Sequence, residues 1–253
     1  MASRARGRDV HIYSANDTTR VLGGLHLGNG MTNANFYSMV EIVFVFDNDY
    51  TLSNESGATV QRDDHPLQKG KYFINTAGSR KFNNEPWMAR TISVGAQAPP
   101  EEFRDAVRVR DRGCFITGQT ARGAAYGDWT GYTATPIFPV THEQDWATHG
   151  HDSWITIPGT RGPLTSVQNG MLLRSDISHL FENYHLSINP DDGYKIVSFI
   201  RDPPLIAGTH LDKTVLGNPE RPVDQLLRWH FRQTVLANVR AEGEPCFDAE
   251  HCF

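Results

Sequence analysis

The chain has 253 residues, 39% of them hydrophobic and 21% charged, with a formal net charge of −5. This composition is that of a globular protein, and no stretch approaches the roughly 20 uninterrupted apolar residues of a membrane-spanning helix. The acidic balance counts against a protein that lives on nucleic acid, because such proteins usually carry a basic face or a basic overall charge.

The N-terminal stretch MASRARGRDVHIYS contains arginines but no apolar core of a secretory signal. We therefore expect a cytoplasmic, intracellular protein without a signal peptide. The three cysteines, Cys114, Cys246 and Cys252, are odd in number and form no C-x-x-C pair. This pattern argues against a disulfide framework and against a cysteine zinc site.

Residues 1–99 are predicted to form a β-rich unit. Short apolar or alternating runs (VHIYS, TRVLGGLHL, MVEIVFVF, YFINTA and MARTISV) are separated by turn signals such as Gly23-Gly24 and Asp47-Asn48. The longest apolar run, residues 42–46, predicts a buried strand. Short strands at this spacing favour a small sandwich or barrel.

Residues 100–253 are predicted to form a second unit, beginning after Pro99-Pro100. Its expected elements are a helix over 100–113, a helix over 169–184 (NGMLLRSDISHLFENY), a strand pair on either side of residues 191–193, and an amphipathic helix over 223–241. Five arginines and two aspartates fall between residues 104 and 122, which is typical of a solvated helix face or, less often, of a phosphate track. The expected fold class is α+β, with the two units packed as one compact body.

Three motifs follow one another in the second unit: CFITG at 114–118, IFP at 137–139 and SVQNGMLLRSDI at 166–177. In this order they closely resemble the fungal HNH-endonuclease-domain proteins, whose pattern is roughly C-x-x-T-G, A-H-I-F-P and S-V-Q-N-G-L-L-L-R-S-D-I-H. The resemblance continues through SINPDD at 187–192, and it includes N-terminal stretches such as TNANFYSMVEI. It implies a ββα-metal unit, in which a hairpin and a helix surround one divalent metal ion.

The resemblance also implies where the nuclease residues would stand. The general-base histidine of the family falls on Pro136, and the metal-binding histidine of the helix falls on Ser178, whereas Asn169 and the carboxylate of Glu182 match. His179 is one position further along, and a shift of one residue rotates a side chain by about 100° around a helix. Losing a general base alone costs about 10²- to 10⁴-fold in rate. We therefore expect no metal cofactor and no nuclease activity.

The segment between the motif halves, THEQDWATHGHDSWITIPG, is dense in acid/base and aromatic side chains. His149 and His151 are two residues apart, so on a strand they would share one face. The segment is consistent with a surface loop carrying two core tryptophans, with an acid/base or substrate-polarising site, or with a metal pair. As catalytic candidates we take His149, His151, Tyr132 and Asp145. The binding candidates are Trp129, Pro136, Trp146, Trp154, Asn169, Ser178 and Glu182.

Three functions follow from these observations. The first is a repurposed HNH-like scaffold that acts on a small molecule as a cofactor-free cyclase or isomerase, similar to a pericyclase or Diels–Alderase, in fungal specialised metabolism. The second is a nuclease in which His142, His149 or His151 has become the base and Glu182, His179 or Asp176 holds Mg²⁺. The third is a non-catalytic module that binds nucleic acid or protein. A small-molecule partner is expected, nucleic acid is disfavoured without being ruled out, and the sequence predicts no oligomeric state.

Overall fold

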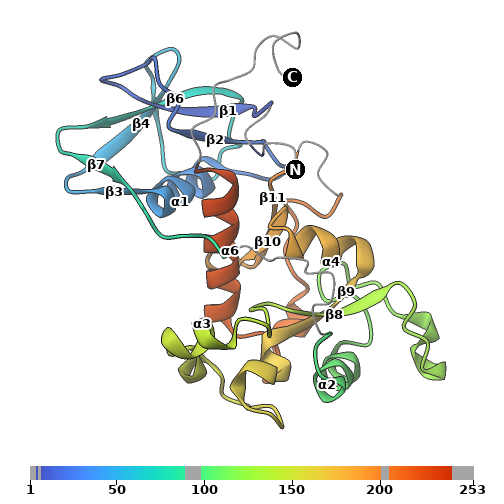
Figure 1. Ribbon diagram of the computed structural model, residues 1–253. Helices are drawn as coiled ribbons and strands as arrows, with labels where there is room; N and C mark the ends of the chain where they lie inside the picture. Colours follow the sequence, from blue (N-terminus) through green and yellow to red (C-terminus); the bar gives the residue numbers. More distant parts are fainter. Residues whose placement is uncertain (1–3, 5–6, 89–97, 201–204, 241–253) are drawn as a thin grey trace, which may run out of the picture. The chain divides into compact units, whose positions relative to one another are not determined.

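The computed structural model describes residues 4, 7–88, 98–200 and 205–240. The protein is mixed α+β, as expected, with several small sheets and helices (Figure 1). It divides into two compact units: unit 1 contains residues 1–88, 197–208 and 232–253, and unit 2 contains residues 89–196 and 209–231. In the described part of the chain, no helix is both long and apolar enough to cross a membrane.

Unit 1 is built on a five-stranded sheet with the strand order β2-β1-β6-β4-β5. The strands are β1 (Val10–Ser14), β2 (Gly23–Leu25), β4 (Tyr50–Asn54), β5 (Thr59–Val60) and β6 (Gly70–Thr76). Strands β1 and β6 are parallel, whereas β1 and β2, β4 and β5, and β4 and β6 are antiparallel. A separate two-stranded sheet pairs β3 (Phe44–Phe46) with β7 (Arg80–Phe82). The described strands thus form an open mixed sheet and a small hairpin-like pair in place of the expected sandwich or barrel.

The prediction of a strand over residues 42–46 is wrong in its first half. Helix α1 (Asn33–Val43) runs through this segment, and only the last three residues form β3. A capping box starts the helix: the Thr32 side chain accepts from the Asn35 backbone N–H, and the Asn35 side chain accepts from the Thr32 N–H. The buried apolar residues then recur at helical spacing: Phe36, Met39, Val40 and Val43. Most of the predicted strand MARTISV lies outside the described residues.

Unit 2 contains helix α2 (Glu101–Asp111), strand β8 (Tyr132–Pro136), helix α3 (Glu143–Thr148), strand β9 (Gly170–Arg174) and helix α4 (Ser175–Glu182). Strand β10 (Leu186–Asn189) pairs with β11 (Lys195–Ser198), as the sequence predicted. Helices α5 (Lys213–Leu216) and α6 (Asp224–Asn238) follow, and the last seven residues of α6 belong to unit 1. Short 3₁₀ turns cover Arg122–Tyr126, His151–Trp154, Pro163–Thr165, Val167–Asn169 and Pro190–Asp192.

The predicted single helix over residues 169–184 is in fact a strand followed by a helix. Strand β9 pairs antiparallel with β8, from Tyr132 opposite Arg174 to Pro136 opposite Gly170. Its central residues Met171, Leu172 and Leu173 are all fully buried. A strand that is buried on both faces has a continuous apolar run, which periodicity cannot distinguish from a buried stretch of helix.

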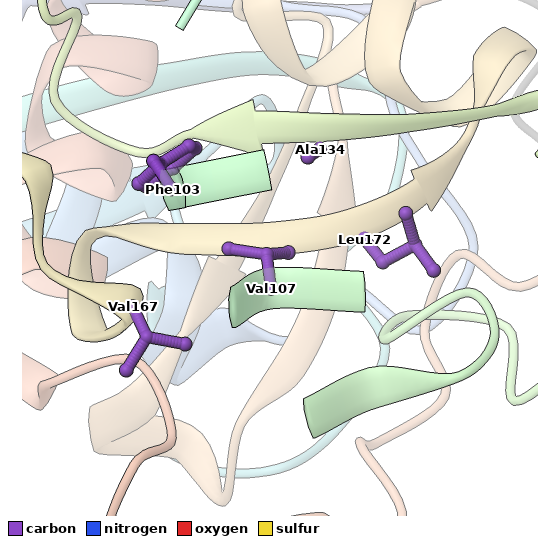
Figure 2. Close-up of a cluster of buried hydrophobic side chains, with 5 residues drawn as sticks. All are labelled: Phe103, Val107, Ala134, Val167 and Leu172. Carbon is purple, nitrogen blue, oxygen red and sulfur yellow. The ribbon is translucent and has the colours of Figure 1, made fainter. Parts of the chain in front are cut away.

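Helix α2 covers one face of the β8–β9 hairpin. Phe103 and Val107 of α2 pack in one buried cluster with Ala134, Val167 and Leu172 (Figure 2). Gly170 permits this close approach, because a Cβ atom there would lie 2.5 Å from Cζ of Phe103. Since side chains alternate along a strand, the opposite face of the hairpin is left for α4.

Candidate functional site

Strands β8 and β9 pair antiparallel as a hairpin, and helix α4 follows β9 directly in the chain. Thr133 and Thr135 point to the α4 face, where the Thr133 hydroxyl lies 3.4 Å from the hydroxyl of Ser175 at the start of α4. Strand alternation places the side chains of Ala134 and Pro136 on the α2 face. The functional site of an HNH-like unit is therefore to be sought where Thr135 meets α4.

At that point two neutral hydroxyl groups meet. Oγ1 of Thr135 lies 2.8 Å from Oγ of Ser178, and both residues are buried, with exposed fractions of 0% and 2%. Ser178 also donates to Oε2 of Glu182 over 3.5 Å, one helical turn further along α4. Glu182 is the only carboxylate in this chain of contacts.

This donor set does not fit a divalent metal ion. Hard cations in proteins take six or more oxygen ligands, several of them carboxylates, and Zn²⁺ takes histidine, cysteine or carboxylate ligands. Here two hydroxyl groups satisfy each other and one carboxylate remains. Within the residues that the structure describes, no group of three or more histidine, cysteine, aspartate or glutamate side chains could hold a metal ion.

Pro136 stands at the end of β8, opposite Gly170. Its side chain therefore shares a face with the place where Phe103 and Val107 approach Gly170. Ser178 lies on the other face of the hairpin, with Thr135. The structure does not bring Pro136 and Ser178 together as two walls of one pocket.

Asn169 binds the backbone at both ends of the long insertion between β8 and β9. Its Oδ1 accepts from the Phe138 N–H over 2.8 Å, and its Nδ2 donates to the carbonyl oxygens of Phe138 and Leu164 over 3.0 and 2.8 Å. The residue is fully buried. Both amide N–H groups are thus engaged with the backbone, which makes Asn169 a structural clamp in this chain.

The insertion carries a cluster of aromatic rings around His151, which we call the His151 cluster. The imidazole stacks on Trp154 with ring centroids 3.9 Å apart, and on His149 at 5.5 Å. Phe138 and Trp146 meet it edge-on at 5.4 and 5.5 Å. His151 is 7% exposed, and its Nδ1 has no hydrogen-bond partner among the described residues. Burial, with a smaller contribution from His149, lowers the pKa of His151 to about 4, so its ring is neutral at physiological pH.

His149 and His151 do not lie on a strand: His149 caps the C-terminus of α3, and His151 begins a 3₁₀ turn. The two rings nevertheless lie face to face. Nδ1 of His149 donates to the Asp145 carbonyl oxygen over 2.7 Å, which makes Nε2 the hydrogen-bond acceptor of the neutral ring. The Asp145 carboxylate instead contacts Nδ1 of His142 at 3.1 Å. Asp152 accepts from the indole N–H of Trp146 over 2.6 Å, which anchors that buried ring.

Two candidates, Tyr132 and Trp129, lie against α2. Both rings pack on the cluster of Figure 2. The Tyr132 hydroxyl donates to the Thr120 carbonyl oxygen over 3.1 Å, and the Arg108 guanidinium lies 5.3 Å from the centre of the Trp129 ring. Their recorded contacts are those of packed aromatic residues. None of these contacts is with the His151 cluster.

The arginine run of α2 is occupied largely by contacts within the protein. Arg110 forms a buried ion pair with Asp111, whose Oδ2 in turn accepts from the Leu172 N–H over 2.7 Å. Arg108 pairs with Asp105 at 3.2 Å in addition to its contact with Trp129. Such contacts favour the interpretation of this run as a structural helix face over a phosphate track.

Sequence reasoning missed three residues of these sites. Thr135 lies one residue before Pro136, and no sequence motif points to it. Its role follows only from its contact with Ser178. Phe138 links the parts of the His151 cluster, since its ring also lies 4.7 Å from that of Trp229 on α6. No local sequence pattern predicts a role for Trp229, because its contact with Phe138 joins residues that are far apart in the sequence.

Residues 114–189 match the family model described as HNH endonuclease, a span that begins at the CFITG turn and ends with β10. The chain carries an HNH endonuclease-like domain. Residues 7–81 match a second family model, described only as a domain of unknown function. The chain has no significant match among curated proteins or solved structures. The HNH-like domain thus contains the hairpin, α4 and the whole insertion with the His151 cluster.

Proposed function

We propose that this HNH-like protein has lost metal-dependent nuclease chemistry and acts on a small organic molecule, as a cofactor-free cyclase or isomerase of fungal specialised metabolism. The observation that carries the proposal is the buried hydrogen bond between Thr135 and Ser178. It occupies the meeting point of strand and helix with two neutral hydroxyl groups. Phosphodiester hydrolysis at an HNH site depends on a bound cation and a positioned base, and the side chains here offer neither.

A nuclease in which other residues have taken over the roles of general base and metal ligand would need both residues at one site. The candidate bases belong to the His151 cluster, whereas the remaining carboxylate, Glu182, contacts Ser178 on α4. Within the part of the chain that the structure describes, no hydrogen bond, ion pair or ring contact joins these two groups. The nuclease alternative therefore has weaker support than a small-molecule function.

The His151 cluster offers the groups that a cofactor-free rearrangement needs. Its rings provide an apolar surface for a conjugated molecule, and a neutral imidazole can hydrogen-bond a carbonyl group without carrying charge into the site. His149 can take up or release a proton at Nε2, because Nδ1 is held by Asp145. A cyclisation or isomerisation on this surface gains and loses no atoms and consumes no oxidant.

The proposal is tested by comparing metabolites of a strain that lacks the gene with those of the parent strain. Because the proposed reaction conserves mass, the deletion should replace a product by an isomer of identical mass. Purified protein should then convert that isomer in the presence of EDTA, and the variant His149→Gln should convert it more slowly. A metabolite difference that includes a change in mass, or conversion that EDTA abolishes, would contradict the proposal.

A further inference from the structure

A pocket of about 410 Å³ lies in unit 2, in the size range of small-molecule sites. It is lined by the insertion, by the 3₁₀ turn before β9 and by the loop that leads into α6. Lining residues include Thr156, Gln168, Leu216, Arg221, Val223 and Gln225.

Gln168 joins the two sides of this pocket. Its Oε1 accepts from the backbone N–H groups of Thr156 and Ile157 over 2.9 and 3.0 Å. Its Nε2 donates to the Thr156 hydroxyl over 2.8 Å and to the Pro219 carbonyl oxygen over 2.9 Å. Two donors and two lone pairs are thereby used, so this buried amide holds the walls and leaves ligand recognition to other groups.

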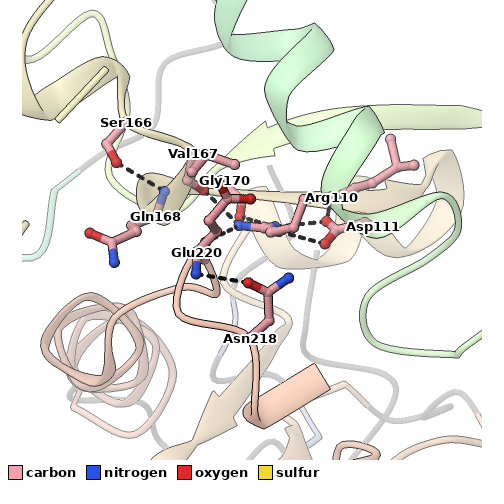
Figure 3. Close-up of polar contacts among 9 residues, drawn as sticks. Arg110, Asp111, Ser166, Val167, Gln168, Gly170, Asn218 and Glu220 are labelled. Carbon is pink, nitrogen blue, oxygen red and sulfur yellow. Dashed lines mark hydrogen bonds and ion pairs between the residues drawn. The ribbon is translucent and has the colours of Figure 1, made fainter. Parts of the chain in front are cut away.

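Arg110 ties the loop at Glu220 to the residues just before and at the start of β9 (Figure 3). Its Nη1 donates to the carbonyl oxygens of Val167 and Glu220 over 2.7 and 2.9 Å, and its Nη2 donates to that of Gly170 over 2.7 Å. Asn218 closes the loop on itself by accepting the Glu220 N–H over 2.9 Å. A loop held in this way is preorganised, which lowers the entropic cost of binding a ligand.

Arg221 is the cation of this pocket. Its Nη1 donates to the Pro222 carbonyl oxygen and to Oδ1 of Asp224, over 2.9 and 2.6 Å. Its guanidinium lies 5.5 Å from the centre of the Tyr194 ring, and the Tyr194 hydroxyl donates to the same Asp224 oxygen over 2.9 Å. Burial would raise the pKa of Asp224, but the hydrogen bonds from Arg221 and Tyr194 outweigh burial and keep it below its ordinary value. Asp224 therefore stays ionised and holds the arginine by one nitrogen.

The other edge of the guanidinium, Nε and Nη2, donates to no carbonyl or carboxylate oxygen of the residues that the structure describes, and the group also interacts with the Tyr194 hydroxyl. Two parallel N–H groups on one edge match the two oxygens of a carboxylate. The planar group is already positioned by Asp224 and Tyr194, so binding would immobilise little further.

Two tryptophans of the aromatic surface stand close in the sequence to residues that line the pocket. Trp154 stands two residues before the pocket residue Thr156, and Trp229 follows Gln225 by one turn of α6, on the same helix face. Both tryptophans are half-buried. They are linked through the cluster, since Trp154 stacks on His151, His151 contacts Phe138, and Phe138 contacts Trp229. Neither ring lines the pocket itself, so a ligand would reach the aromatic side chains with a part that extends beyond the pocket.

We propose that Arg221 binds the carboxylate of a small, planar organic acid in this pocket, with the apolar body of the acid directed to Trp154 and Trp229. The inference rests on the proposed small-molecule function and specifies its substrate class. It gives the site one point of charge recognition and an uncharged aromatic surface.

The test compares two probes of the same shape, 2-naphthoate and 2-naphthamide, by isothermal titration calorimetry on the full chain. The carboxylate should bind at least about tenfold tighter than the amide, which corresponds to about 1.4 kcal/mol. The variant Arg221→Gln should lose this preference, and Arg221→Lys should retain part of it. Arg228→Gln is the matched control, because it removes the same charge one helix position before Trp229 but outside the pocket, where Arg228 pairs with Asp191.

Equal affinity for the two probes, no binding of either at millimolar concentration, or equal loss in Arg228→Gln would overturn the inference. The comparison of the two probes on the unaltered chain needs no variant, so it remains decisive if Arg221→Gln fails to fold. DNA cleavage would overturn the proposed function itself. Equal affinities for 2-naphthoate and 2-naphthamide, in the absence of DNA cleavage, would overturn only the carboxylate site.

Discussion

The hydroxyl groups of Thr135 on β8 and Ser178 on α4 lie 2.8 Å apart in a fully buried position, where strand and helix of the HNH-like unit meet. With the Ser178 proton directed to Glu182, the Thr135 hydroxyl is the donor to Ser178. The contact ties the helix to the hairpin without a metal ion. Its contribution should therefore be measurable as stability.

A double-mutant cycle with Thr135→Val and Ser178→Ala tests this contact. We expect each single variant to lower the free energy of unfolding by about 1–2 kcal/mol, because a buried hydroxyl loses its partner, and the coupling energy to be about 1 kcal/mol. Urea denaturation in the presence of EDTA gives these values. A coupling energy near zero, or a stability that depends on added Mg²⁺, would contradict the contact as described.

Asn169 should behave as a clamp of the insertion. Asn169→Ala removes three buried hydrogen bonds and leaves the Phe138 N–H and two carbonyl groups without this partner, so we expect a loss of about 3 kcal/mol or more. Asn218→Ala is the control, since it removes one hydrogen bond, to the Glu220 N–H, and should cost about 1 kcal/mol or less. Thermal unfolding of both variants measures the difference. If Asn169→Ala were as stable as the parent, the clamp would be disproved.

The buried imidazole of His151 should make the protein less stable in acid. Its folded pKa of about 4 lies below the ordinary value of 6.5, so the unfolded chain takes up this proton first as the pH falls. As the pH falls from 6.5 to 4, this group should lower the free energy of unfolding by about 1–3 kcal/mol, where the lower figure allows for solvent screening. His151→Phe should reduce the pH dependence in that window. Unfolding curves that keep the same pH slope in His151→Phe would refute the assignment.

Arg110 should matter for folding and not for nucleic-acid binding. Replacing it by glutamine leaves the buried Asp111 carboxylate without its cation and frees three backbone carbonyl groups, so we expect a loss of about 3–5 kcal/mol. Arg112→Gln, at an exposed position, is the comparison and should cost less than about 0.5 kcal/mol. Gel-shift titrations at low and physiological salt should show no specific DNA binding by the parent chain. Salt-sensitive binding that Arg112→Gln weakens would support the nucleic-acid-binding alternative.

Much of the architecture is readable from the sequence where a local cause decides the structure. Helices α2 and α6 and the β10–β11 pair were predicted because acidic first turns, amphipathic spacing and the turn at residues 191–193 are local signals. The apolar run at residues 42–46 misled, since the Thr32 capping box ten residues earlier starts a helix that extends into it. Met171 to Leu173 were predicted to be part of a helix but form a strand. The strand is buried on both faces, so its apolar residues do not alternate with polar ones.

The site was predictable only in part. The motif order placed Ser178 and Glu182 on one helix face, and the structure joins them. The side of the hairpin on which Pro136 lies depends on its pairing with Gly170, and the partner of Ser178 depends on strand register. Trp229 contacts Phe138 and Arg221 contacts Tyr194, and each pair joins residues that are far apart in the sequence. Such relationships are set by tertiary packing, which a single sequence does not display.

The most direct test of the central claim is a plasmid-nicking assay with the purified full chain in Mg²⁺ or Mn²⁺, beside an active nuclease as positive control. With no metal-binding cluster in the described residues and a hydroxyl pair at the strand–helix contact, we predict no nicking above a sample without protein. Glu182→Gln should give the same result. Metal-dependent nicking by the parent chain that Glu182→Gln abolishes would contradict the account.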